Sequence, residues 1–301
     1  SSWGDAFVDL QDALVAANNL SQEVDIYVAQ GTYYPTSGID RSISFEIPPN
    51  VRLQGGFRGD EVGPIIGGLW ETFPTILSGN IGNRDSREDN SYHVLKATDL
   101  NSSFFINGFI VRDGYANGGG ADRHGAGMYI KDLSSSSERT EMISCLFTEN
   151  IAESGDGGAI YIENAEVNIA FQYFQNNQAR GDGGAICVRG SSSKVNISTC
   201  DFIGNQSTTE EGGAIAAFGA ELNVGRSAFI QNQGNQGGGI YTGRNNALLI
   251  DYCTFFNNQT GQGIGSAIRA RGSAIVKNSI FWKNDNTSSI STEGNAAITY
   301  T

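Results

Sequence analysis

The sequence has little proline, few charged residues and no long hydrophobic run. Only 5 of its 301 residues are Pro, which excludes a proline-rich linker or a collagen-like chain. Charged residues make up 17%, and 19 Lys and Arg stand against 32 Asp and Glu. A chain so short of cations is a poor candidate for binding the phosphates of nucleic acid. No segment approaches the ~20 apolar residues of a membrane-spanning helix. No basic segment followed by an apolar one opens the chain, so we expect any export signal to have been removed.

Glycine and a repeated motif are what the sequence has in abundance. There are 40 Gly, and 39% of the residues are hydrophobic, enough to build a core. The motif Phe-x-x-Asn recurs with steps of 27, 28, 27, 26 and 26 residues. Its Phe positions are Phe147, Phe174, Phe202, Phe229, Phe255 and Phe281. A second motif, Gly-Gly-Ala-Ile or a variant of it, alternates with the first and ends at Met128, Ile160, Ile186, Ile215, Ile240 and Ile268.

Short stretches of alternating apolar and polar residues lie between the two motifs. Examples are Ile160-Tyr161-Ile162-Glu163 and Val167-Asn168-Ile169. Such stretches are typical of short strands separated by turns, and a fixed period of this length is typical of a solenoid. The sequence therefore predicts an all-β fold: a right-handed, single-stranded parallel β-helix with coils of about 27 residues and three short strands per coil.

The predicted domain organisation is one β-helix domain over residues 1–301. Residues 1–23 hold apolar side chains at helical spacing, which predicts an amphipathic helix that caps the open end of the solenoid. Irregular early coils are expected over 24–124, with a polar insertion at 131–141, and regular repeats over 125–301. The last seven residues resemble a further strand, so we expect the chain to be a fragment of a longer β-helix, or its last coil to be covered by another element.

Two inward columns follow from the repeat. The motif asparagines should stack at a turn with each amide bonded to the next, because a buried amide needs partners. They are Asn150, Asn177, Asn205, Asn232, Asn258 and Asn284. Cys145, Cys200 and Cys253 share another column but lie two coils apart, roughly 9–10 Å, which is too far for a disulfide. Cys187 falls on a different strand and points outward, so the sequence predicts four buried thiols and no disulfide.

The paired Gly-Gly-Ala-Ile and Phe-x-x-Asn repeats resemble those of the chlamydial polymorphic outer-membrane proteins. The N-terminal half resembles a broader class of secreted bacterial surface β-helix proteins, through segments such as Trp3-Gly4-Asp5-Ala6-Phe7 and Leu53-Gln54-Gly55-Gly56-Phe57. This resemblance covers nearly the whole chain. It implies export, a location on the bacterial cell surface outside the outer membrane, and an adhesin-like role. It brings no catalytic residue with it, since the shared motifs are structural.

Two neighbouring outward columns are candidates for ligand binding. Aligning the Gly-Gly units places aromatic and charged side chains one coil apart on a single face. Flat aromatics beside hydrogen-bonding groups suit an extended glycan, although Tyr is also favoured in any strand. The candidate glycan-binding residues are Tyr129, Tyr161, Tyr241, Arg189, Phe218 and Arg269.

A third column, immediately before Gly-Gly, is the candidate site for chemistry. It holds His124, Asp156, Asp182 and Glu211, with Arg123 nearby in sequence. Three acids at coil spacing repel one another unless a cation lies between them, so Ca²⁺ at Asp156, Asp182 and Glu211 is one interpretation. Paired carboxylates could also serve a glycoside hydrolase, or a lyase with a basic partner. Ordinary turn chemistry of Asp before Gly is the third interpretation.

The sequence thus supports two functional hypotheses. The first is a non-enzymatic secreted or surface module for adhesion, glycan contact or scaffolding, with no required cofactor and a glycan or cell-surface partner. The second is a polysaccharide lyase or glycoside hydrolase that acts on an extended glycan, either acidic or uncharged. The fold cannot choose between them, and no nucleophile elbow, phosphate loop or dinucleotide fingerprint is present in the sequence.

Overall fold

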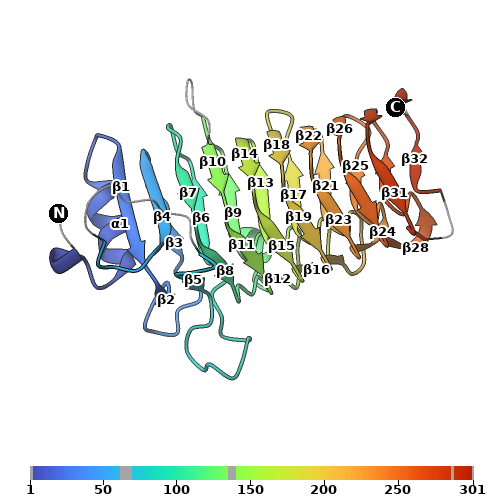
Figure 1. Ribbon diagram of the computed structural model, residues 1–301. Helices are drawn as coiled ribbons and strands as arrows, with labels where there is room; N and C mark the ends of the chain where they lie inside the picture. Colours follow the sequence, from blue (N-terminus) through green and yellow to red (C-terminus); the bar gives the residue numbers. More distant parts are fainter. Residues whose placement is uncertain (1–2, 62–69, 135–139, 286–287, 300–301) are drawn as a thin grey trace.

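A parallel β-helix of four stacked sheets forms the body of the protein (Figure 1). The computed structural model describes residues 3–61, 70–134, 140–285 and 288–299. In each regular coil the chain passes through sheets A, B, D and C in turn and then returns to sheet A one coil further along. The all-β prediction and the parallel solenoid are confirmed.

Sheets A and B are the first two sheets that the chain enters in each coil. Sheet A consists of β1 (Val24–Ala29), β4 (Val51–Phe57), β7 (Phe105–Asn107), β10 (Thr140–Ile143), β14 (Glu166–Ala170), β18 (Lys194–Ser198), β22 (Glu221–Gly225), β26 (Ala247–Asp251), β30 (Ser273–Lys277) and β33 (Ala296–Thr299). Sheet B consists of β2 (Gly31–Tyr33), β5 (Thr75–Ser78), β8 (Ile110–Arg112), β11 (Leu146–Thr148), β15 (Tyr173–Gln175), β19 (Asp201–Ile203), β23 (Ala228–Ile230), β27 (Thr254–Phe256) and β31 (Ile280–Trp282).

Sheets C and D complete the coil. Sheet C consists of β3 (Phe45–Glu46), β6 (Leu95–Thr98), β9 (Met128–Lys131), β13 (Ile160–Glu163), β17 (Ile186–Arg189), β21 (Ile215–Phe218), β25 (Ile240–Thr242), β29 (Ile268–Ala270) and β32 (Ile290–Thr292). Sheet D consists of β12 (Ile151–Ala152), β16 (Gln178–Ala179), β20 (Gln206–Ser207), β24 (Gln233–Gln236) and β28 (Gln259–Ile264). The expectation of three strands per coil missed sheet D, because three of its strands have only two residues, and the longer β24 and β28 consist mostly of polar residues and Gly, without apolar alternation.

The repeat phenylalanines form a continuous stack inside the β-helix. Ring centroids of neighbouring Phe lie 4.7 to 5.5 Å apart from Phe147 to Phe281, and their planes agree within 19°. Five of the six are fully buried, and Phe281 in the last coil is partly buried. The in-register pairing of sheet B places each Phe opposite the next, so the period seen in the sequence is the coil itself.

The repeat asparagines form a buried ladder at the corner between sheets B and D. From Asn150 to Asn258, each Nδ2 donates to Oδ1 of the Asn in the next coil, at 3.0 to 3.1 Å. The same Oδ1 accepts the main-chain N–H of the preceding Asn, and Nδ2 also donates to the carbonyl of a core Phe, as from Asn205 to Phe174. Every polar atom of these buried amides is therefore paired.

The Gly-Gly pairs are required by the corner between sheets D and C. The first glycine of each pair has a left-handed backbone, for example Gly183 with φ 68°, which costs other residues energy. The second glycine has no room for a side chain: a Cβ on Gly184 would lie 2.2 Å from the carbonyl oxygen of Gly213.

Helix α1 (Leu10–Asn18) covers the first coil and contacts β1 and β3. It begins later than the apolar pattern suggested, because the Asp9 side chain caps it by accepting the N–H of Gln11. Leu10, Leu14 and Ala17 are buried against the core, whereas Phe7 lies outside the helix and is exposed. Among the described residues, no helix is long and apolar enough to cross a membrane.

The early coils carry the longest connections. One precedes β5 (58–74), and the next follows it (79–94) and projects below the β-helix in Figure 1. The short 3-10 helices η1 (Trp3–Asp5) and η2 (Gly120–Arg123) also lie in this half. The predicted insertion at 131–141 falls between β9 and β10, and its residues 135–139 lie outside the described part of the chain. The predicted final strand is present as β33.

Candidate functional site

The acidic column stands at the corner between sheets D and C, where His124, Asp156, Asp182 and Glu211 lie one coil apart. The side chains of His124, Asp156 and Asp182 each accept the main-chain N–H of the column residue in the next coil. The N–H of Asp156 donates to His124 Nδ1 (3.1 Å), that of Asp182 to Asp156 Oδ1 (2.9 Å) and that of Glu211 to Asp182 Oδ1 (3.2 Å). The column is thus a second hydrogen-bonded ladder, which satisfies N–H groups at the turn before Gly-Gly.

Arg189, at the end of β17, supplies the positive charge that this column needs. Its guanidinium donates to Asp156 Oδ2 (3.0 Å) and to Asp182 Oδ2 (2.7 Å). Both carboxylate side chains are 12% exposed. The alignment had placed Arg189 in the glycan-binding face; instead it reaches across the face to the acids, and its guanidinium lies 4.4 Å from the ring centroid of Phe218.

The two aspartates differ in their acidity. Burial opposes ionisation of Asp156, but the hydrogen bond to His124 and the charge of Arg189 outweigh it and lower the pKa of Asp156. Burial and the negative charge of Asp156 raise the pKa of Asp182, although Arg189 works in the opposite direction. The pair therefore releases its protons in two well-separated steps.

This geometry is that of a structural network. All four carboxylate oxygens of Asp156 and Asp182 accept hydrogen bonds from the protein. Glu211 turns instead toward Gln236, and Arg123 ends η2 with an exposed side chain. The described residues contain no group of three or more His, Cys, Asp or Glu arranged to hold a metal ion. Calcium at Asp156, Asp182 and Glu211 stays a prediction.

The tyrosine column faces outward from sheet C, but its rings have little exposed surface. Tyr129 and Tyr161 are each 5% exposed. Their rings stack 5.4 Å apart with planes within 4°, and His124 stacks on Tyr161 at 4.6 Å. Burial raises the pKa of Tyr129 to about 12. The tyrosines face outward as aligned, but the turn that carries the acidic column and the side chain of Arg189 cover them, so they offer little surface to a ligand. Glycan binding at these positions stays a prediction.

Tyr241 and Arg269, two further residues of the predicted glycan-binding face, are also buried and contact other side chains of the protein. Tyr241 is 4% exposed, and its ring lies 5.6 Å from that of Phe218. Arg269 is 8% exposed and pairs with Glu293. Cys187 is buried among Tyr129, Tyr161 and Phe218. All four cysteines of the chain are free thiols and buried.

An open cavity lies at the corner between sheets A and B, where no site was expected. Its volume is about 330 Å³, and we call it cavity 1. It is lined by Trp70, Glu71, Thr72, Ser144, Phe171, Tyr173, Thr199, Asp201 and Arg226. Trp70 comes from the connection before β5, and its ring meets that of Tyr173 edge to face at 5.8 Å. Aromatic walls with acidic, basic and hydroxyl groups between them are typical of a saccharide site.

The corner between sheets A and B, part of which lines cavity 1, has an uncommon backbone. Ser144, Phe171, Thr199, Arg226 and Tyr252 occupy the same place in successive coils, each with φ between 50° and 54°. Bulky or β-branched residues are rare in this left-handed region, which costs about 1–2 kcal/mol for residues other than Gly. Phe171 is 55% exposed, so burial of its ring does not offset the free-energy cost of its left-handed backbone. The same conformation recurs at this corner beyond cavity 1, at Tyr252 and Asn278, and at the corner between sheets B and D, as at Gln231 (φ 55°), so it belongs to the turns of the β-helix rather than to the cavity.

Comparison with known proteins fixes the family. A family model described as a right-handed β-helix region matches residues 100–300. The chain belongs to the right-handed β-helix family. Searches among curated proteins and among solved structures gave no match. β-Helix domains of this family occur in surface proteins, adhesins and polysaccharide-degrading enzymes, so the family leaves the choice of function to the site.

One column of the repeat, which the alignment did not include, indicates cavity 1. The residue before each member of the Cys145, Gln172, Cys200, Ser227 column is the corner residue itself. Extending the alignment by one position would have shown large side chains at a turn where Gly or Asn fits best. No periodicity could have found Trp70, because it reaches Tyr173 from a connection outside the repeat.

Proposed function

We propose that this β-helix binds an extended glycan on the outer face of sheet B, as a secreted or cell-surface module with an adhesion role. The observation that carries the proposal is cavity 1. Its Trp70 and Tyr173 present aromatic surface to a sugar ring, while Asp201 and Arg226 flank them with hydrogen-bonding groups. The resemblance to the chlamydial polymorphic outer-membrane proteins supports a bacterial source, export, and a place outside the outer membrane or in a larger surface assembly.

The acidic column is poorly suited to catalysis, which favours a binding module over an enzyme that acts at this column. Asp156 and Asp182 have every carboxylate oxygen engaged by main-chain N–H groups or by Arg189. A hydrolase needs carboxyl groups that are free to reach the glycosidic oxygen and the anomeric carbon or a water molecule. The proposed binding needs no cofactor.

A glycoside hydrolase is the second candidate function, and one observation favours it. Burial raises the pKa of Asp201 in cavity 1, the direction required of a general acid. Glu71 supplies a second carboxylate to the same cavity. An Asp201→Asn variant separates the two functions, since it should abolish hydrolysis but only weaken binding.

The test is a glycan array followed by titration calorimetry on the best-binding oligosaccharide, with release of reducing ends and of unsaturated uronate measured in parallel. We expect binding without cleavage, and a loss of affinity of about tenfold or more for Trp70→Ala. An unchanged affinity in Trp70→Ala would contradict the placement in cavity 1. Cleavage that is lost in Asp201→Asn would replace the binding module with the hydrolase.

A further inference from the structure

Seven asparagines and glutamines form a patch on the outside of sheet D and of the corner between sheets B and D. We call this patch the amide surface, and it consists of Asn176, Gln178, Gln206, Gln231, Gln233, Asn257 and Gln259. Parallel pairing places the four glutamines of sheet D in register in successive coils, from Gln178 to Gln259. At the usual spacing of strands, this column is about 14 Å long.

The side chains of the amide surface are free to bind a ligand. Gln233 and Gln259 are exposed, and the other two glutamines of sheet D are half-buried. None of the seven side-chain amides has a hydrogen-bond partner in the part of the chain that the structure describes. The outward asparagines of sheet A differ, because Nδ2 of Asn196 donates to Asn168 (2.9 Å) and Nδ2 of Asn223 donates to Asn196 (3.0 Å). The amide surface therefore offers donors and acceptors that the sheet A row has already used.

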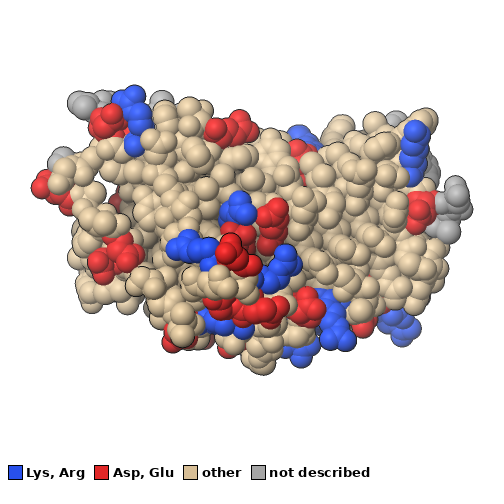
Figure 2. Space-filling model, turned by 90° about the horizontal axis from the view of Figure 1, so that it is seen from below, with Lys and Arg blue, Asp and Glu red and all other residues tan. Residues whose placement is uncertain are grey.

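The strands beneath the amide surface carry no charge. Strands β16, β20, β24 and β28 contain no Lys, Arg, Asp or Glu. In Figure 2, which views the molecule from below, charged side chains gather in the middle of the face, and uncharged surface extends to their right, toward the C-terminal end. A ligand with many charges of one sign therefore finds no complementary charge on these strands.

A second cavity adjoins the N-terminal end of the amide surface, at the corner between sheets B and D. Its volume is about 430 Å³. Its walls include Asn176, which belongs to the amide surface, and Ile151, which pairs in register with Gln178. Residues of the connection 79–94 also line it. A polymer that lies along the amide surface can therefore extend into this cavity.

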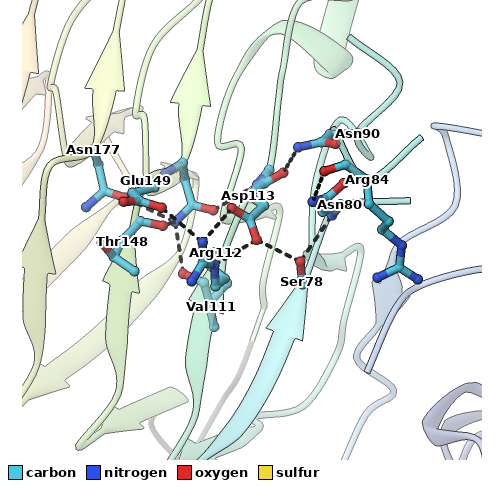
Figure 3. Close-up of polar contacts among 12 residues, drawn as sticks. Ser78, Asn80, Arg84, Asn90, Val111, Arg112, Asp113, Thr148, Glu149 and Asn177 are labelled. Atoms are coloured by element: carbon cyan, nitrogen blue, oxygen red, sulfur yellow. Dashed lines mark hydrogen bonds and ion pairs between the residues drawn. The ribbon is translucent and has the colours of Figure 1, made fainter. Parts of the chain in front are cut away.

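Polar contacts hold the connection and the acids of this cavity in place. Asn90 Nδ2 donates to the carbonyl of Asp113 (2.7 Å). Arg112 donates to both carboxylate oxygens of Asp113 (2.7 and 3.2 Å) and to Glu149 (3.1 Å). Figure 3 shows Asp113 between Arg112 and Asn90. Both acids thus have a cation beside them, and this end of the surface is ordered before any ligand arrives.

We infer that the amide surface binds an uncharged polysaccharide that lies along the axis of the β-helix. A sugar hydroxyl donates one hydrogen bond and accepts others, which matches the NH₂ group and the carbonyl oxygen of a side-chain amide. A polysaccharide repeats its hydroxyl groups along its length, as the surface repeats its glutamines from coil to coil. A protein partner would need apolar side chains to bury at the centre of the contact, and none stands at the seven positions. The inference goes beyond the proposed function, because it assigns a second surface that does not include cavity 1.

The experiment is affinity electrophoresis of the intact chain in gels that contain mixed-linkage β-glucan, galactomannan, xyloglucan or polygalacturonate. Calorimetry follows, with oligosaccharides of the polymer that retards the protein most. We expect a neutral polymer to give the strongest retardation, and its hexasaccharide to bind more tightly than its trisaccharide, because the surface extends over several coils. The double variant Gln206→Ala with Gln233→Ala should lose affinity by about tenfold. Gln54→Ala, at an outward glutamine of sheet A, is the matched control and should bind as the wild type does.

The outcomes separate this inference from the proposed binding in cavity 1. Loss of affinity in the double variant but not in Gln54→Ala, with an unchanged unfolding midpoint, supports the amide surface. Retardation that Trp70→Ala removes and the double variant leaves unchanged would overturn the inference and support cavity 1. Stronger retardation by polygalacturonate than by every neutral polymer would overturn the selection for an uncharged ligand. Absence of retardation by all four polymers would also overturn the inference, and a dimer that only the double variant dissociates would then identify a second copy as the occupant.

Discussion

Tyr173 begins strand β15 and Asn176 directly follows its last residue, and the two line different cavities: Tyr173 lines cavity 1, whereas Asn176 lines the second cavity at the corner between sheets B and D. A three-residue strand spans only about 10 Å. Between them Phe174 points into the core, and Gln175 faces outward from sheet B. Residues 70–72, which precede β5, line the first cavity, and residues of the connection that follows β5 (79–94) line the second. One early coil thus shapes both sites on an otherwise regular sheet.

Replacement of a strained corner residue should separate binding from stability. Phe171→Asn keeps a residue that tolerates a left-handed backbone, so we expect the free energy of unfolding to stay equal or to rise by up to about 1 kcal/mol. Glycan affinity should fall, because an aromatic wall of cavity 1 is lost. Tyr252→Asn is the matched control: it has the same φ of 54° and similar exposure but does not line the cavity. Equal affinity losses in the two variants would argue against cavity 1.

The asparagine ladder should contribute more to stability than the polar rows on the surface. Asn205→Ala leaves the N–H of Asn177 without its acceptor and removes one hydrogen bond each from Nδ2 of Asn177, which still donates to Phe147, and from the carbonyl of Phe174. At about 1–3 kcal/mol for each buried group, we expect a loss of about 3 kcal/mol or more. Asn196→Ala, in a half-buried row on sheet A that bonds to Asn168 and Asn223, should cost less than about 1 kcal/mol. Urea denaturation of both variants checks the difference, and similar midpoints would refute it.

The fold was readable from the sequence because the same physical demands recur in every coil. A column of Phe fills the core, a column of Asn satisfies a buried turn, and Gly183 with Gly184 shows why each corner needs two glycines. Sheet D and the start of α1 were missed. The strands of sheet D either have two residues or, in β24 and β28, consist mostly of polar residues and Gly, so they show no apolar alternation. The start of α1 is set by the cap at Asp9 rather than by its apolar face.

The site was less predictable, because outward direction and exposure are different properties. Tyr161 faces away from the core as aligned, yet a neighbouring turn covers it. Asp156 and Asp182 were correctly placed side by side, but the alignment could not show that Arg189 reaches both of them. Trp70 and Asn90 lie on connections outside the repeat, whose positions depend on tertiary contacts.

The four buried thiols should not react with a thiol reagent in the native protein. Cys145, Cys187, Cys200 and Cys253 have at most 1% of their surface exposed, and burial raises the pKa of Cys145 to about 11 and of Cys200 to about 12. Since the thiolate is the reactive form, we expect no reaction with a thiol reagent at neutral pH until the chain unfolds, when four thiols should react. Fewer than four in the unfolded, unreduced protein would reveal a disulfide and show the coil register to be wrong.

The acidic ladder should give the protein a pH dependence that one substitution removes. The pKa of Asp182 is raised in the folded state above the value of about 4 expected for an unfolded chain. The folded state therefore holds this proton more tightly, and the stability that Asp182 contributes is lost as the pH rises from about 4 toward its folded pKa. The lowered pKa of Asp156 has the opposite effect, and its contribution is lost only as the pH falls below about 4.

In urea denaturation between pH 4 and 8, the midpoint of Asp182→Asn should fall less with rising pH than that of the wild type. Asp201→Asn serves as the comparison for a half-buried acid outside the ladder. Parallel pH profiles for wild type and Asp182→Asn would show that Arg189 keeps Asp182 ionised throughout, and that the two aspartates titrate as independent groups.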